Sequence, residues 1–273
     1  MKIDNSGASH PQVGLGDADI VYMEQVEGGL TRLAAVFSSR LPARVGPVRS
    51  ARESDVELLA PFGRVRLGFS GAAAGVVNIV DSSRLVDSSY DRVASAYARD
   101  YSRPAPYNLF ADPSAVIKGS QSPDGSRNVG LTFGIQRGGI PAGSMSVRVA
   151  NELVSFRYDS PSHRWALSMD GVPSQVAEGG PVAAENVIVQ YVDVVGSRFV
   201  DVRGSVSPYT VTTGSGNTVV FRDGHRFDGT WQRSQKTGPT RYLDRQGNDI
   251  LLHPGTTWIL LATKGTPLTA SAP

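Results

Sequence analysis

The chain lacks cysteine, long apolar runs and any block of like charge. The absence of cysteine from the 273 residues excludes disulfides, thiolate catalysis and cysteine-ligated zinc. The 27 basic and 25 acidic residues leave a net charge of +2, and no basic stripe indicates a nucleic-acid partner. No apolar run approaches the roughly 20 residues of a membrane-spanning helix, and no signal peptide is visible. We therefore expect a folded, cysteine-free chain that binds no nucleic acid.

Signatures of catalysis and of cofactor binding are equally scarce. The four histidines are widely scattered in sequence, at His10, His163, His225 and His253. There is no G-x-S-x-G elbow, no H-E-x-x-H motif and no calcium-loop spacing. The glycine-rich stretches match neither the phosphate loop nor the dinucleotide fingerprint. The sequence therefore predicts no metal and no cofactor, and it leaves open whether the chain is an enzyme.

Glycine, proline and short apolar runs dominate what remains. The 30 glycines, 17 prolines and 40% hydrophobic content suit many short strands and turns. We predict an α+β fold, with a mixed α/β domain over residues 1–120 and a β-rich domain over residues 121–273 that can share one core. A polar loop at 119–126 separates them. Asp112-Pro113 predicts a helix start. Strands are expected at 18–23, 32–37, 65–69, 145–149, 153–158, 164–169, 187–192, 218–222, 241–243 and 257–261.

The segment from Gly46 to Glu53 carries the strongest local signal. Gly-Pro predicts a turn, and Ser50 with Glu53 matches the S-x-x-E capping box of a helix start. We predict a helix from about Ala51 to Pro61. Arg49 and Arg52 flank its N-terminus, where backbone N–H groups and a partial positive charge already favour anions. This pattern predicts an anion site, although both arginines could instead pair with carboxylates of the fold.

Ten segments carry a resemblance to a known family, and they span nearly the whole chain in order. They are 2–5, 11–15, 18–22, 27–32, 46–52, 103–109, 187–192, 220–224, 229–231 and 254–258. The chain resembles the YerB-like family of bacterial lipoproteins, for which no reaction is established. The resemblance implies an exported, membrane-anchored protein whose lipid-bearing cysteine lies upstream of these residues. Tyr107 stands where the family pattern usually has histidine, which puts histidine chemistry at that position in doubt.

These residues are compatible with three different functions. The first is recognition of an anionic envelope ligand, such as a phosphorylated or carboxylated glycan. Arginines would clamp the charge, a serine would cap the helix, and short polar side chains would read hydroxyls. The residues of this expected ligand site are Asp4, Asn5, Arg49, Ser50, Arg52, Arg103 and Asn108.

The second function is an envelope hydrolase in the same region. Two carboxylates of different pKa would act as acid and base on a glycosidic or phosphodiester bond. The candidates are Asp4, Asp19, Glu24 and Glu27.

The third function is a non-catalytic scaffold that binds an envelope protein. The β-rich half favours it, because exposed strand edges suit partner binding. Trp231, Trp258 and Tyr191 are possible interface anchors, but their apolar surroundings predict core positions for such aromatic residues.

Overall fold

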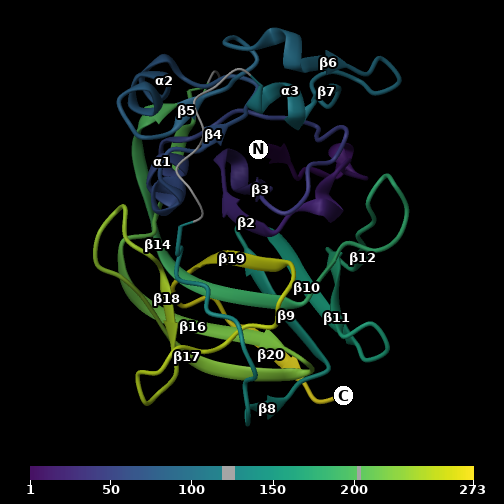
Figure 1. The fold of residues 1–273 in the computed structure, drawn as a ribbon, viewed down its shortest axis with the longest axis vertical. Helices are drawn as coiled ribbons and strands as arrows, with labels where there is room; N and C mark the ends of the chain where they lie inside the picture. The colour runs from purple at the N-terminus through teal and green to yellow at the C-terminus, as the bar shows by residue number, and fades with distance from the viewer. Residues whose placement is uncertain (119–126, 202–203) are drawn as a thin grey trace.

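The computed structural model describes residues 1–118, 127–201 and 204–273. Two β-sheets stack on each other, and short helices gather beyond one end of the larger sheet (Figure 1). The predicted polar loop at 119–126, and with it the expected boundary at residue 120, lies outside the described residues.

The larger sheet has ten strands and joins the two halves of the chain. Parallel pairing of β2 with β19, and of β19 with β14, links the N-terminal strands to the C-terminal ones, while the other pairs are antiparallel. The sheet is therefore mixed and continuous across both halves. Its main path is β1 (Lys2–Asp4), β3 (Thr31–Val36), β2 (Ile20–Gln25), β19 (Thr257–Thr263), β14 (Asn186–Val200), β16 (Gly214–Arg222), β17 (His225–Arg233) and β18 (Arg241–Leu243), with β15 (Val206–Val211) on β14 and β8 (Ile140–Pro141) on β17.

The smaller sheet has six antiparallel strands, all from residues after 143. Its order is β12 (Val172–Pro173), β11 (Arg164–Met169), β10 (Glu152–Asp159), β9 (Ser144–Val149) and β20 (Leu268–Ser271), with β13 (Ala183–Ala184) paired to β11. Two further ladders are β4 (Arg66–Leu67) with β5 (Val86–Asp87), and β6 (Tyr97–Arg99) with β7 (Leu109–Ala111).

The described α-helices are short and all belong to the N-terminal half. They are α1 (Glu53–Leu59), α2 (Ala74–Asp81) and α3 (Pro113–Ile117), with single 3₁₀ turns at Gly7–Ser9, Leu15–Asp17, Glu27–Gly29, Ala60–Phe62 and Ala94–Ala96. As predicted, Asp112 caps α3 by accepting the backbone N–H groups of Ser114 and Ala115. Across the described residues, no helix has the length and apolar character needed to cross a membrane.

The predicted capping box at Ser50 is wrong. The helix begins at Glu53, and the Asp55 carboxylate accepts the backbone N–H of Arg52 at 2.7 Å. Ser50 lies too early because its neighbours are extended: the Arg49 N–H donates to the Lys2 carbonyl, and the Ala51 N–H donates to the Gly71 carbonyl. These bonds hold the backbone before residue 52 out of the helical conformation.

The main core lies between the two sheets. Side chains alternate along each strand, so one face of β2, β3 and β19 meets the smaller sheet. Trp258 packs edge-on against Phe156 at 5.9 Å between ring centroids, and Trp165 packs against Phe221 at 5.4 Å. Trp231 is buried on the opposite face of the larger sheet. Trp231 and Trp258 are therefore core residues, as their apolar surroundings predicted.

Candidate functional site

A row of charged side chains crosses the N-terminal strands of the larger sheet. Asp4 of β1 lies opposite Arg32 of β3, which in turn lies opposite Glu24 of β2. Directly opposite residues of antiparallel strands project to the same face. Helix α1 and the extended segment before it cover this face, and they bring Arg49 and Arg52 to it. The structure thus gathers several predicted residues around one that the sequence hypotheses left out, Arg32.

Arg49 is paired with Asp4 at one end of this row. The Arg49 Nε lies 2.5 Å from Asp4 Oδ2, and the other carboxylate oxygen accepts the backbone N–H of Ser6 at 2.7 Å. The Arg49 side chain is 23% exposed, and its guanidinium lies 5.7 Å from the centre of the Tyr107 ring. Asp4 therefore orders the end of β1 and neutralises Arg49, which remains partly accessible.

Arg52 is paired with Glu27 at the other end. The Arg52 Nε donates to both carboxylate oxygens, at 2.7 and 3.0 Å, and Nη2 adds a contact at 2.5 Å. Ser207 of β15 also donates to this carboxylate. Burial would raise the pKa of Glu27, but the hydrogen bonds from Arg52 and Ser207 outweigh it and hold the pKa below its usual range. The bidentate geometry links the 3₁₀ turn Glu27–Gly29, the start of α1 and β15.

Arg32 lies between these two ion pairs, and among the described residues no carboxylate forms an ion pair with it. Only 8% of the residue is exposed, and within the same residues it makes one hydrogen bond, from Nη1 to the Ser50 carbonyl at 3.3 Å. Burial, and then the charges of Arg52 and Arg49, lower its pKa to about 10. A guanidinium has five N–H donors, so Arg32 presents unused donors at the centre of the charged row.

Lys2, Glu24 and Asp55 form a completely buried cluster under α1, which shares Glu24 with the row. The Lys2 Nζ contacts the Glu24 carboxylate and lies 2.7 Å from Asp55 Oδ1, and all three side chains are 0% exposed. Ser54 donates to Glu24 at 2.8 Å. Burial and the Asp55 charge raise the pKa of Glu24 to about 7, against the attraction of Lys2. Since no surface of the cluster is open, we assign Glu24 a structural role.

Asn5 connects the two halves of the chain next to this row. Its amide nitrogen donates to Thr31 Oγ1 at 2.7 Å and to Glu152 Oε2 at 3.0 Å, the latter on β10 of the smaller sheet. Its oxygen accepts from Gln12 at 3.1 Å and lies 3.3 Å from His10 Nε2. Asn5 therefore joins the edge of the larger sheet to the smaller sheet through its amide.

Three other predicted residues hold separate local structures. Arg103 donates to the carbonyls of Ser9 and Pro11, at 3.1 and 2.9 Å. Asn108 accepts a hydrogen bond from Arg99. Asp19 closes the turn after β3 by accepting the N–H groups of residues 38 and 39. These hydrogen bonds do not join Arg103, Asn108 or Asp19 to the row around Arg32.

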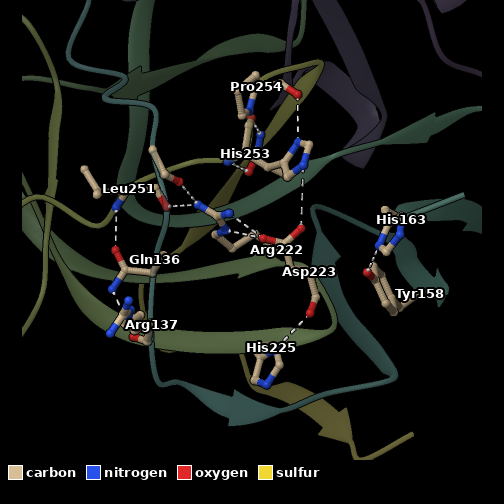
Figure 2. A network of polar contacts seen from close by, with 12 residues as sticks. Gln136, Arg137, Tyr158, His163, Arg222, Asp223, His225, Leu251, His253 and Pro254 are labelled. Carbon is tan, nitrogen blue, oxygen red and sulfur yellow. Dashed lines mark hydrogen bonds and ion pairs between the residues drawn. The ribbon is translucent and has the colours of Figure 1, made fainter.

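Three of the four histidines come together at the β16–β17 turn, far from this row in the sequence (Figure 2). His225 Nδ1 lies 2.8 Å from the Asp223 carbonyl, and His253 Nε2 lies 4.0 Å from Asp223 Oδ1. His163 Nδ1 lies 3.2 Å from the Tyr158 hydroxyl beside them. His253 is 40% exposed, and its separation from Asp223 exceeds a hydrogen bond. Over the described ranges, no three His, Asp or Glu side chains are arranged to hold a metal ion.

The chemistry of the row favours binding over proton transfer. Asp4, Glu24 and Glu27 are each held by a cation and by a hydroxyl or backbone donor. A general base must reach its substrate directly or through one water, and these carboxylates are mostly buried. The conspicuous group is instead Arg32, which lies in segment 27–32 of the family resemblance but was given no role in the hypotheses from sequence.

Comparisons with known proteins agree over almost the whole chain. The family model "Protein of unknown function (DUF3048) N-terminal domain" matches residues 1–126, and the corresponding C-terminal domain matches residues 145–259. The Bacillus subtilis (strain 168) protein named "Putative lipoprotein YerB" is 27% identical over 274 residues, which cover 94% of this chain and 78% of that protein. The crystal structure of YerB from Bacillus subtilis shares the fold, with a TM-score of 0.81 at 24% identity over 98% of this chain and 92% of that one.

Proposed function

Because this chain belongs to the YerB-like family and carries both DUF3048 domains, we propose that it is a membrane-anchored binding protein of the cell envelope that recognises an anionic ligand. The name of its Bacillus subtilis relative as a lipoprotein supports the extracytoplasmic location and a lipid anchor upstream. The ligand is an anionic group of the phosphate or carboxylate class, carried by a glycan of the envelope. Its receptor is Arg32 of β3.

The observation that carries this proposal is the unpaired charge of Arg32. A buried cation is costly unless it is paired and hydrogen-bonded, yet within the described part of the chain this guanidinium makes one long hydrogen bond, to the Ser50 carbonyl. The carboxylates on either side of it are already bound to Arg49 and Arg52. An anion at Arg32 would supply the missing partner.

The neighbouring ion pairs would assist in binding. Arg49 and Arg52 would add to the positive potential at Arg32, since the charges of both lower its pKa. The charged row and the buried cluster together hold four cations, Lys2, Arg32, Arg49 and Arg52, and four carboxylates, Asp4, Glu24, Glu27 and Asp55, so protonation of Glu24 leaves one positive charge in excess. Binding of an anion whose own charge is constant in this range, such as sulfate, should therefore strengthen as the pH falls through about 7. The partly exposed Arg49 forms the approach to the site.

Thermal unfolding with phosphate, sulfate and chloride at constant ionic strength tests the proposal. Phosphate at 100 times its dissociation constant should stabilise the protein by about 2.7 kcal/mol, a shift of several degrees. Arg32→Gln should abolish the shift, while Arg148→Gln should keep it, because Arg148 is an exposed arginine that bonds only the carbonyl of Asn151.

Two results would contradict the proposal. One is a folded wild type with no shift from phosphate, from carboxylated sugars or from muropeptide fragments. The other is an anion shift that Arg32→Gln retains, which would place the anion elsewhere. We expect Arg32→Gln to be more stable than wild type in the absence of ligand. We also expect its unfolding temperature not to change when phosphate is added.

The hydrolase alternative requires a carboxylate with access to substrate. Asp19 is engaged in the turn after β3, and Glu24 is sealed under α1. The remaining candidates, Asp4 and Glu27, lie in ion pairs with side-chain exposures of 5% and 8%. These contacts favour a binding role for the row, and a turnover assay follows only if an anion binds at Arg32.

A further inference from the structure

We propose that an open cleft in the C-terminal half of the chain binds an uncharged oligosaccharide. The cleft has a volume of about 860 Å³ and is lined by β14, β16 and β17 of the larger sheet, by Leu268 of β20 in the smaller sheet, and by the segments 244–245 and 264–266. Strands β16 and β17 lie at the end of the molecule opposite α2 and α3 (Figure 1). Arg32, Arg49 and Arg52 do not line the cleft, so this inference goes beyond the anion site proposed above and does not depend on it.

The floor of the cleft continues the inner face of the larger sheet beyond the core. Val219 and Phe221 of β16 belong to the core between the two sheets. Asn217 lies two residues before Val219 and pairs with Thr230 of β17, so both side chains project to this same face. Asn217 and Thr230 are exposed and line the cleft. The sheet therefore presents polar side chains where its inner face leaves the apolar interior.

Tyr191 of β14 supplies the aromatic surface of the cleft. Its side chain is half-buried and packs against the core between the sheets. The buried Trp231 donates its indole N–H to the Tyr191 carbonyl at 2.8 Å, and a Cβ on Gly216 would lie 2.7 Å from both of these atoms. Gly216 thus leaves room for the bond that fixes the backbone of Tyr191. Burial raises the pKa of the Tyr191 hydroxyl, which is therefore an uncharged donor near neutral pH.

Hydroxyl and amide groups with free hydrogen-bonding capacity line the cleft together with this ring. They belong to Ser215, Asn217, Thr230 and Thr266. Within the part of the chain that the structure describes, these four side chains form no hydrogen bond with other protein groups. Each hydroxyl can donate and accept, and the amide offers two donors and one acceptor. Sugar hydroxyls also donate and accept, while the C–H groups of a sugar ring can pack on the tyrosine ring, so a sugar matches both features.

The charges of the cleft favour an uncharged ligand. Arg226 Nε lies 2.7 Å from Asp228 Oδ1, and Arg245 Nη2 lies 4.0 Å from the other oxygen of the same carboxylate. Lys264 Nζ lies 2.5 Å from Asp193 Oδ2. Each cation that lines the cleft thus faces a carboxylate, so the attraction for an anion is largely cancelled. Hydroxyl groups can still bond to the free lone pairs and N–H groups of these ion pairs.

The size of the cleft favours an oligosaccharide over a single sugar. Small-molecule sites range from roughly 300 to 1,000 Å³, and the 860 Å³ of this cleft lies in the upper part of that range. A cavity of about 150 Å³ already holds a benzene ring. The cleft therefore has room for several sugar rings.

Saturation-transfer difference NMR, which detects weak binding, tests the inference. The probes are uncharged trisaccharides of glucose, of mannose, of galactose and of N-acetylglucosamine. The wild-type protein should transfer saturation to at least one of them. Its dissociation constant should be the same at roughly 50 and 500 mM salt, because an uncharged ligand forms no ion pair that salt could screen.

Three substitutions locate the site. Tyr191→Ala should weaken binding roughly two- to tenfold, the range of one aromatic contact. Asn217→Ala and Thr230→Val should each weaken it roughly two- to tenfold, the range of one hydrogen bond. The control is Tyr101→Ala, which removes a tyrosine that is 86% exposed and does not line the cleft. Circular dichroism and thermal unfolding verify that each variant is folded, and the two variants at exposed positions locate the site even if Tyr191→Ala does not fold.

Several outcomes would overturn the inference. They are no saturation transfer to any of the four trisaccharides, binding that weakens as salt is added, or affinities in the folded cleft variants that equal the affinity of Tyr101→Ala. The last result would place the sugar elsewhere on the protein. An absence of sugar binding with an intact phosphate response would leave the Arg32 proposal standing, and sugar binding without a phosphate response would leave only the cleft.

Discussion

Replacing Glu24 by glutamine isolates the one carboxylate whose burial should control stability near neutral pH. Glu24 shares Lys2 with Asp55, so a single ammonium faces two buried carboxylates. Glutamine keeps the length of the side chain and can still accept the hydrogen bond from Ser54. The substitution therefore removes the titration with little change in packing, and it leaves the pair of Lys2 with Asp55 intact.

The magnitude follows from the pKa of Glu24, which rises from 4.5 in the unfolded chain to about 7 in the folded protein. Folded Glu24 holds its proton more tightly, so its contribution to stability is full below pH 4.5 and is lost as the pH rises through 7. At about 1.4 kcal/mol for each pH unit over this window, wild type should lose about 3 kcal/mol that Glu24→Gln does not lose. For a chain of this size, the difference corresponds to roughly 6 °C in Tm or more.

Urea unfolding and Tm measured every half unit from pH 4.5 to 7.5 would test this. The informative quantity is the free energy of unfolding of wild type minus that of Glu24→Gln at each pH, because the titrations that both proteins share cancel in the difference. Glu178→Gln is the control: Glu178 is exposed and accepts the N–H of Gly14, and its variant should follow the pH slope of wild type. If Glu24→Gln also follows that slope, Glu24 is ionised throughout the range and our account of the buried cluster is wrong.

Three further substitutions test the packing around the site. Arg52→Gln leaves the carboxylate of Glu27 largely buried without its bidentate partner, and we expect the free energy of unfolding to fall by about 3 kcal/mol in urea titrations. Trp231→Phe removes the bond from the indole N–H to the Tyr191 carbonyl and should cost about 1–3 kcal/mol by the same measurement, with an unchanged far-UV spectrum. Asp112→Ala removes the cap of α3 and should cost about 1 kcal/mol, seen as a Tm lower by a few degrees, whereas Asp112→Asn should restore most of it.

The role of the arginines changes once their partners are known. Sequence motifs predicted that Arg49 and Arg52 bind an anionic ligand together. In the fold, Arg49 is instead paired with Asp4, and Arg52 is paired with Glu27. Arg32 lies between them and, among the described residues, forms no ion pair with a carboxylate. The anion hypothesis therefore stays a prediction, and we propose Arg32 in place of Arg49 and Arg52 as the receptor.

Much of the secondary structure was predictable because it depends on local patterns. Alternating or continuous β-branched segments predicted β9, β10, β11 and β19 within one or two residues. They also predicted the start of β14 within one residue, but this strand continues to Val200, eight residues beyond the predicted end. Asp112-Pro113 predicted the start of α3 for the same reason. The Ser50 capping box failed because two non-local hydrogen bonds, to residues 2 and 71, keep its flanking backbone extended. A local sequence motif carries no information about hydrogen bonds to residues that are distant in the sequence.

The sequence by itself determined the strand-rich character, the family, the absence of thiol chemistry and the segments in which the charged residues lie. It could not determine which charges meet, since that depends on strand register and on long-range packing. Only the tertiary structure decided that Asp4 pairs with Arg49, that Glu27 pairs with Arg52 and that Arg32 is left between them. The physical reason is that an ion pair forms between side chains brought within 4 Å, and strand pairing and the packing of the segment before α1 bring together residues that lie 25 to 45 positions apart in the sequence.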